Sequence, residues 1–153
     1  MLERIAPFLG RYCTVEPGAG ICPTGVEVQF REKFALERFD DWVRYRQQAV
    51  DVATGRVLHD EAGVLRQAPD GSWELSLAMN SGRLEYGRVT WDPGGSSALR
   101  TDSTEFHRDR LGLRAMRRWF RFDAEGCDKE LWLSTGVWPE LQRHMWSRLQ
   151  RMQ

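Results

Sequence analysis

The chain has 153 residues, with 22 lysine and arginine residues against 22 aspartate and glutamate residues and a formal net charge of +0. This length suits about one domain with its own core, so we expect a single domain over residues 1–153. The balanced charge creates no field that would attract nucleic acid or a membrane surface, and neither is expected as a partner. A homodimer is left open by the sequence.

Cysteine usage and hydropathy bear on where the protein works. Cys13, Cys22 and Cys127 cannot all pair within one chain, and they lack the close cysteine–histidine spacing of a zinc site. Residues 1–20 contain charges and no continuous apolar block, and no run of 18 apolar residues follows. No secretory signal or membrane span is therefore expected, and we predict a cytoplasmic protein.

Most of the chain has the alternating pattern of β-strands. The loose helical spacing of Leu2–Leu9 predicts a short helical turn that ends at Gly10, whereas Glu16–Pro23 is rich in Gly and Pro and is expected to be a loop or a bent edge. The polar run Arg31–Lys33 is expected to shift the apolar face of its strand. The expected strands are Gly10–Val15, 26–36, Trp42–Val52, Val57–Arg66, Trp73–Met79, Arg83–Trp91, Ala98–His107, Ala115–Phe122 and Cys127–Thr135.

Short turns join these strands. Gly55, Gly71 and Gly82 stand where tight hairpins need a positive φ, and Asp92–Ser97 is a further Gly-rich turn. Consecutive hairpins without longer crossings favour an all-β protein, an antiparallel up-and-down β-barrel of about ten strands, over a sandwich. Such a barrel can hold one small ligand. Its inward residues are expected to include Phe30, Leu36, Leu75, Leu77 and Trp132.

The last segment, Trp138–Gln153, has a different pattern. Leu141, Met145 and Leu149 recur every fourth residue, and Pro139 suits the first turn of a helix. We predict one C-terminal helix over 138–151 that folds against one opening of the barrel. His144 lies beside the apolar stripe and is expected to point inward.

Several segments resemble the nitrobindin-like haem-binding β-barrels, which are relatives of fatty-acid-binding proteins and lipocalins. The matching segments are Leu9–Tyr12, Pro23–Thr24, Phe30–Phe34, Val43–Tyr45, Leu58–Arg66, Pro69–Gly71, Glu74–Ala78, Ser81–Gly82 with Glu85, and Leu141–Leu149. The resemblance implies a ferric haem b whose proximal ligand is the histidine of a C-terminal pattern Leu-x-x-His-(Leu/Met)-x-x-x-Leu, here His144. It also implies that His59 lies near the distal side of the haem.

One segment departs from the family pattern. The family has Gly-x-Trp-x-Gly-x-Gly-x-Gly-x-Tyr-Pro near its N-terminus, whereas Gly10–Pro23 is two residues longer. Tyr12 replaces the Trp, Thr14 and Glu16 stand at glycine positions, and Cys22 precedes the proline. Because this segment borders the haem site in the family, the change bears on the ligand more than on the fold.

Two functions follow. The resemblance implies a haem protein that binds NO and isomerises peroxynitrite to nitrate through iron held by His144. The alternative is a lipocalin-like carrier of a small apolar ligand without haem. From the residues alone, His59 and His144 can equally be core or rim histidines, and no pair of histidines has the spacing of a zinc site. Arg114, Arg117, Arg118 and Arg121 are interpreted as a solvated strand face.

Overall fold

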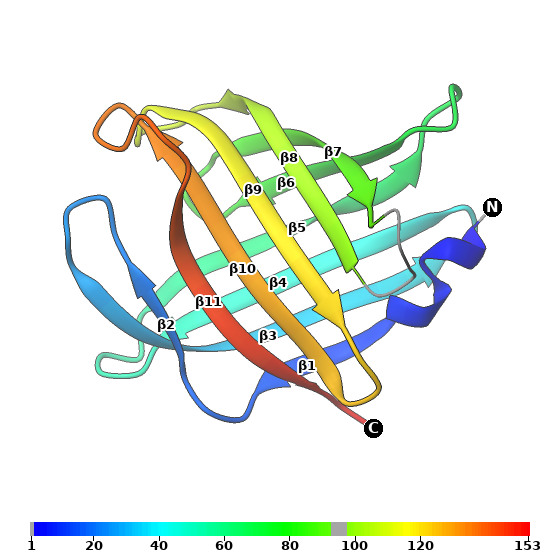
Figure 1. The fold of residues 1–153 in the computed structure, drawn as a ribbon, viewed down its shortest axis with the longest axis horizontal. Coiled ribbons are helices and arrows are strands. Elements are labelled where there is room, and N and C mark those ends of the chain that lie inside the picture. The colour runs from blue at the N-terminus through cyan, green and yellow to red at the C-terminus, as the bar shows by residue number, and fades with distance from the viewer. Residues whose placement is uncertain (1, 93–97) are drawn as a thin grey trace.

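The computed structural model describes residues 2–92 and 98–153, and its strands form one antiparallel sheet that closes into a barrel (Figure 1). Two short 3-10 turns, η1 (Leu2–Arg4) and η2 (Ala6–Phe8), precede the strands, as predicted. The eleven strands of the described residues are β1 (Gly10–Thr14), β2 (Gly18–Ile21), β3 (Glu27–Phe39), β4 (Trp42–Asp51), β5 (Val57–Gln67), β6 (Trp73–Met79), β7 (Leu84–Trp91), β8 (Ala98–His107), β9 (Leu113–Phe122), β10 (Gly126–Thr135) and β11 (Gln142–Arg151).

The barrel closes through its first two strands. Each of β3 to β10 pairs with the next strand along the chain, and β11 pairs with β10. Both β1 and β2 lie between β3 and β11: β1 pairs Tyr12 with Phe34, and β2 pairs Gly20 with Val28. They therefore occupy one interrupted position, and the result is a ten-stranded antiparallel barrel with an extra strand, which confirms the predicted up-and-down topology.

The predicted C-terminal helix is wrong, because residues 142–151 form β11. A spacing of four residues is also a multiple of the strand period of two, so Met145 and Leu149 lie on the same inward face of a strand. The residue between them, Ser147, is buried and polar, and this polar residue concealed the alternation. Hydrogen-bonding partners on both sides, β10 on one and β1 with β2 on the other, hold the segment in the sheet.

Part of the expected loop 16–23 is also a strand, β2. Its glycines allow close approach to the neighbouring strand: a Cβ built on Gly20 would lie 2.9 Å from the carbonyl oxygen of His144. The hairpin turns are confirmed, since Gly55, Gly71 and Gly82 all have positive φ. The expected turn Asp92–Ser97 lies mostly outside the described residues.

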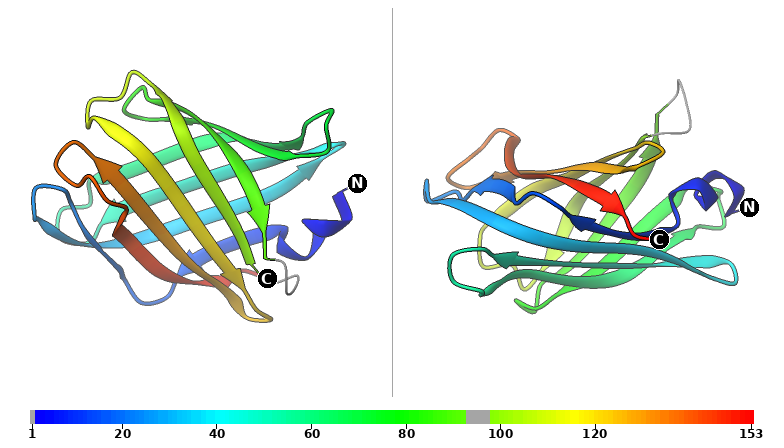
Figure 2. Two further views of the ribbon diagram at one scale, coloured as in Figure 1. Left: turned by 45° about the horizontal axis from the view of Figure 1, so that its top comes forward. Right: turned by 90° about the horizontal axis from the view of Figure 1, so that it is seen from below.

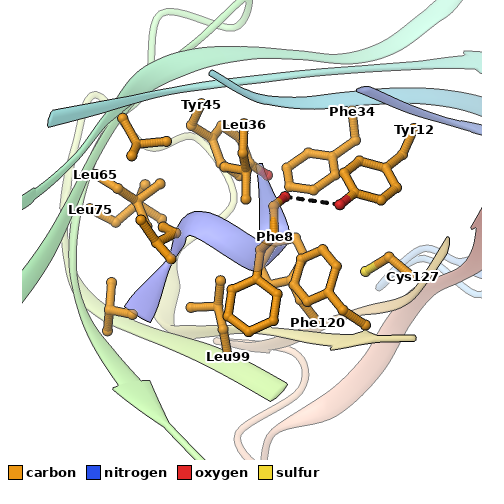
Figure 3. Close-up of a cluster of buried hydrophobic side chains, with 14 of the residues drawn as sticks. Phe8, Tyr12, Phe34, Leu36, Tyr45, Leu65, Leu75, Leu99, Phe120 and Cys127 are labelled. Atoms are coloured by element: carbon orange, nitrogen blue, oxygen red, sulfur yellow. Dashed lines mark hydrogen bonds between the residues drawn. The ribbon is translucent and has the colours of Figure 1, made fainter. Parts of the chain in front are cut away.

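One end of the barrel is filled and capped. The N-terminal turns lie across this end, opposite the loops that follow β2 and β10 (Figures 1 and 2). Phe8 from η2 packs on Phe122 at a ring distance of 4.5 Å, and the hydroxyl of Tyr12 donates to the carbonyl oxygen of Phe8 at 2.9 Å (Figure 3). Among the described residues, this end of the interior is filled by packed side chains.

The predicted inward residues are mostly confirmed. Phe30, Leu36, Leu75 and Leu77 are buried in the barrel. The prediction that Trp132 points inward is wrong by one residue, because its neighbours Leu131 and Leu133 are buried instead. The indole of Trp132 is only partly buried, and its nitrogen donates to Glu130 at 2.8 Å. Among the described residues, no helix has the length and apolar character needed to cross a membrane.

Candidate functional site

The interior has three layers along the barrel axis. On each of five strands, the inward residues change from apolar to polar and back to apolar. The triplets are Phe34, Glu32 and Phe30 on β3; Tyr45, Gln47 and Ala49 on β4; Phe120, Arg118 and Met116 on β9; Cys127, Lys129 and Leu131 on β10; and Leu149, Ser147 and Met145 on β11. The first members belong to the capped end, and the last members form a second apolar cluster at the other end, here called the histidine end.

His144 is turned into the histidine end by a β-bulge. Met145 pairs with Leu131 and Arg143 pairs with Trp132, so His144 has no residue opposite it on β10. A bulge of this kind re-aims the extra side chain. As a result, His144 and Met145 are both buried although they are neighbours in a strand. The expected inward direction of His144 is correct, but a bulge produces it.

A hydrogen bond fixes the orientation of the His144 ring. Its Nδ1 lies 2.6 Å from the carbonyl oxygen of Ile21 at the end of β2. Since a carbonyl can only accept, Nδ1 carries the hydrogen and Nε2 keeps its lone pair. Burial lowers the pKa of His144, although the bond to Ile21 opposes the shift. His144 is therefore a neutral imidazole with a free nitrogen donor for a metal.

His59 on β5 faces His144. The two ring centroids lie 6.0 Å apart and the rings are nearly perpendicular, at 83°. Burial lowers the pKa of His59 to about 4, and the attraction of Glu61 only partly offsets this effect. The Nδ1 atom of His59 is buried and has no hydrogen-bond partner within the described residues. The structure thus brings together the two histidines that were singled out from the sequence.

A layer of charged and polar side chains forms the floor below the histidines. This polar layer consists of Glu32, Gln47, Glu61, Glu85, Ser103, Arg118, Lys129 and Ser147, all buried. Arg118 donates to Glu61 at 3.1 Å and binds both carboxylate oxygens of Glu85, and Lys129 pairs with Glu32. Because ions are costly to remove from water, each charge in the layer needs such a partner.

The polar layer was not predicted from the sequence. Arg118 is 0% exposed, so its assignment to a solvated face is wrong, whereas Arg117 on the other face is partly exposed and pairs with Asp102 at 2.6 Å. Glu32 also lies inside, which means that the apolar face of β3 does not shift at residues 31–33. Strict alternation between Phe30 and Phe34 was the available signal, since it places Glu32 on their face.

The remaining candidates lie elsewhere. His107 is exposed at the end of β8, and the three cysteines are free. A surface hollow of about 860 Å³ is lined by Trp42, Arg66 and Pro69 near the capped end, and neither histidine lines it. A hollow of only about 10 Å³ lies beside Met145 in the barrel. A porphyrin would therefore have to part the side chains of the histidine end.

The chemistry of the histidine end fits a haem. A porphyrin supplies four nitrogen ligands and needs one protein donor, which the Nε2 of His144 offers. Within residues 2–92 and 98–153, no three His, Cys, Asp or Glu side chains are grouped to hold a bare metal ion. Apolar side chains that suit a porphyrin face surround the site: Phe30, Ala49, Met116, Leu131, Leu133 and Met145, with Leu58, Phe106 and Leu113 packed against them.

Comparison with known proteins identifies the class. A family model described as a THAP4-like, heme-binding beta-barrel domain matches residues 1–151, so the chain belongs to this family of haem-binding barrels. The resemblance to nitrobindin-like proteins is thereby confirmed. A small-molecule ligand within the barrel is consistent with the family description.

Individual relatives cover nearly the whole chain. The chain is 29% identical over 160 residues to a protein named peroxynitrite isomerase 1 from Mycolicibacterium paratuberculosis, a match that covers 98% of this chain and 94% of the relative. It is 28% identical over 156 residues to the peroxynitrite isomerase of Mycobacterium leprae, covering 99% and 95%. The crystal structure of Rv2717c from M. tuberculosis matches with a TM-score of 0.83 and 27% identity, over 99% of this chain and 97% of that one.

Proposed function

We propose that this protein binds haem b through His144 and, with ferric iron, isomerises peroxynitrite to nitrate and binds NO. The observation that carries the proposal is the hydrogen bond from Nδ1 of His144 to the carbonyl oxygen of Ile21, because it leaves the lone pair of Nε2 for a metal at the apolar histidine end. The relatives named peroxynitrite isomerase support the choice of reaction.

Ferric haem, when bound, supplies a Lewis-acidic iron that attracts an anionic oxygen or NO. The chain's own residues do the remaining work. His144 holds the cofactor, and Ile21 keeps the imidazole in the required tautomer and orientation. Apolar side chains such as Phe30 and Leu131 would exclude water from the place where the cofactor binds. His59 would lie beside the cofactor as a neutral ring.

The alternative function, a carrier of an apolar ligand without haem, is less well supported. The polar layer contains Glu61, Glu85 and Arg118, and the rings of His144 and His59 lie above it. An apolar ligand gains nothing from these groups, whereas a haem uses a histidine as an axial ligand. Hemin uptake separates the two functions, because only the haem protein develops a Soret band with the spectrum of a histidine-ligated iron.

Stopped-flow measurement of peroxynitrite decay tests the proposed reaction. The hemin-loaded protein is expected to speed the decay and to yield nitrate, in comparison with haem-free protein and with free hemin at the same concentration. A decay no faster than that of the haem-free protein, measured while the Soret band shows bound haem, would contradict the isomerase and leave a haem carrier. NO binding is checked separately by the shift of the Soret band in NO-saturated buffer.

A further inference from the structure

Within the described residues, Arg83 is a buried cation without a carboxylate partner. It directly precedes β7 and is 4% exposed, and it shares the inward face with Glu85 because the two are separated by one residue. One guanidinium nitrogen, Nη2, donates to the sulfur of Met79. Its Nε is buried and has no acceptor among the described residues. A thioether is a weak acceptor, so Arg83 keeps unused donor capacity at its buried Nε.

The nearest carboxylate in the sequence is already occupied. Oε1 of Glu85 accepts from Ser103 at 2.6 Å and from Arg118, and its Oε2 accepts from Arg118 at 3.0 Å. Arg83 feels the charge of Glu85 without contacting it, and burial is the larger influence, which lowers the pKa of Arg83. An arginine nevertheless stays protonated in a protein, so its positive charge lacks a direct counterion.

Arg83 lies at the histidine end. The hairpin that carries it is joined to β5, since the amide of Asn80 donates to the carbonyl of Asp60 at 2.9 Å, one residue from His59. Arg83 contacts Met79, and Met79 pairs with Glu61, which is two residues from His59 on β5. The buried Nδ1 of His59 also lacks a partner within the described chain. Two buried nitrogens without a partner among the described residues thus lie on neighbouring strands at this end.

We propose that Arg83 and His59 form a subsite for a planar, monovalent oxyanion. A guanidinium presents parallel N–H groups that match two oxygens of such an anion, and the His59 imidazole donates one further hydrogen in the tautomer that carries it on Nδ1. Nitrite, nitrate and the carboxylate of a haem propionate share this chemistry. The choice of nitrogen oxyanions rests on the proposed function. The finding that Nε of Arg83 and Nδ1 of His59 lack a partner among the described residues is independent of that function.

The first test uses haem-free protein, so its outcome is independent of haem chemistry. Nitrate is titrated at constant ionic strength, with chloride replaced, while NMR follows the Nε–H signal of Arg83. The signal is expected to shift in a saturable way. Arg83→Met should weaken nitrate binding by about tenfold or more, the loss typical of a charged hydrogen bond. The matched control is Arg88→Met, which removes an exposed arginine from β7, the strand that Arg83 precedes.

The second test distinguishes the two sources of the anion. Hemin and hemin dimethyl ester, which lacks free carboxylates, are bound to the wild type and to Arg83→Met. If a propionate occupies the subsite, the ester binds the wild type more weakly than hemin does, and Arg83→Met removes the difference. If a free oxyanion occupies it, the variant leaves the hemin-to-ester ratio unchanged, and nitrate still binds the haem-loaded wild type.

Other outcomes would overturn the subsite. An Arg83 signal that nitrate leaves unmoved, together with a hemin-to-ester ratio that Arg83→Met leaves unchanged, would mean that Arg83 only balances the buried carboxylates. Arg83→Lys provides a second variant if Arg83→Met does not fold. It keeps the charge without the planar fork, and it should bind nitrate more weakly than the wild type does. Equal binding would contradict recognition by the guanidinium.

Discussion

At the scale of single residues, the buried charges in the middle of the barrel are the costliest feature of the sequence. Arg118 is the largest fully buried side chain in the described chain, and it holds two carboxylates, Glu61 and Glu85. Breaking a buried ion pair leaves charges that neither water nor a partner stabilises. Removing one charge from the polar layer is therefore expected to lower stability more than removing one partner of an ion pair on the outer face.

Replacing Arg118 by Met should lower the free energy of unfolding by about 3–5 kcal/mol, because two buried carboxylates lose their partner. Arg117→Met is the matched control, since Arg117 pairs with Asp102 on the partly exposed face. That change should cost about 0–1 kcal/mol. Urea denaturation of both variants measures the difference, and equal losses would contradict the role of the polar layer.

The pKa of Glu61 makes stability depend on pH. Burial raises this pKa, but the charges of Arg118 and Lys129 lower it to about 2, below the ordinary 4.5. Above pH 4.5 the carboxylate is ionised in the folded and unfolded chain, and its stabilisation is complete. As the pH falls from about 4.5 toward 2, the unfolded chain binds the proton first, so stability is lost.

Glu61→Gln should therefore flatten the pH dependence of the unfolding free energy between pH 4.5 and 2. The measurement is urea denaturation at several pH values in this window, for the variant and the wild type. Asp60→Asn, an exposed neighbour on β5, serves as the control and should retain the slope. A Glu61→Gln slope equal to that of the wild type would show that Glu61 titrates alike in both states.

At the scale of elements, the sequence predicted strands β3 to β10 but not the last strand, β11. Alternation and glycine turns were sufficient to locate β3 to β10, although the inward faces of several of these strands include a buried polar residue. The terminal segment was misread because Met145 and Leu149 fit helical and strand spacing equally, and the polar Ser147 faces inward to bind Glu32 at 2.8 Å. Alternation places Glu32 and Ser147 on an inward face, but it does not show which side chain across the barrel each of them binds.

The two histidines were found for a different reason. Their positions came from the resemblance to a family, whereas the bulge that turns His144 inward depends on the register between β10 and β11. Register is a property of strand pairing, so the position of this bulge was not predicted from the local sequence. Arg118 and Glu32 were missed because charged residues were assigned to solvent by default. Only the assembled barrel shows that Arg118 pairs with Glu61 and that Glu32 pairs with Lys129.

The contact between β2 and β11 gives a test at this scale. A Cβ on Gly20 would press on the carbonyl of His144 at 2.9 Å and on Met145 at 3.1 Å. Gly20→Ala should therefore displace the strand that positions His144, costing about 1–3 kcal/mol in stability and weakening hemin binding. Gly136→Ala, where a Cβ meets nothing within 4 Å, is the control. Unchanged hemin affinity in Gly20→Ala would contradict the tight fit.

At the scale of the whole molecule, the barrel separates stability from binding. The capped end packs Phe8, Tyr12 and Phe34 into a dense core, and the polar layer divides this core from the histidine end. Within the described residues, the 3-10 turns lie at the capped end only, and the histidine end contains a separate apolar cluster together with His144 and His59. A ligand that enters there can displace side chains without disturbing the core that keeps the barrel folded.

Hemin binding to His144→Ala tests the central claim most directly, because His144 is the proposed donor to the iron. The wild type and His107→Ala, which removes an exposed histidine, are expected to bind hemin with the same affinity and Soret spectrum. His144→Ala should bind hemin at least about tenfold more weakly and lose the spectrum of histidine ligation. Unchanged affinity and spectrum in His144→Ala would contradict the assignment and would mean that another residue binds the iron.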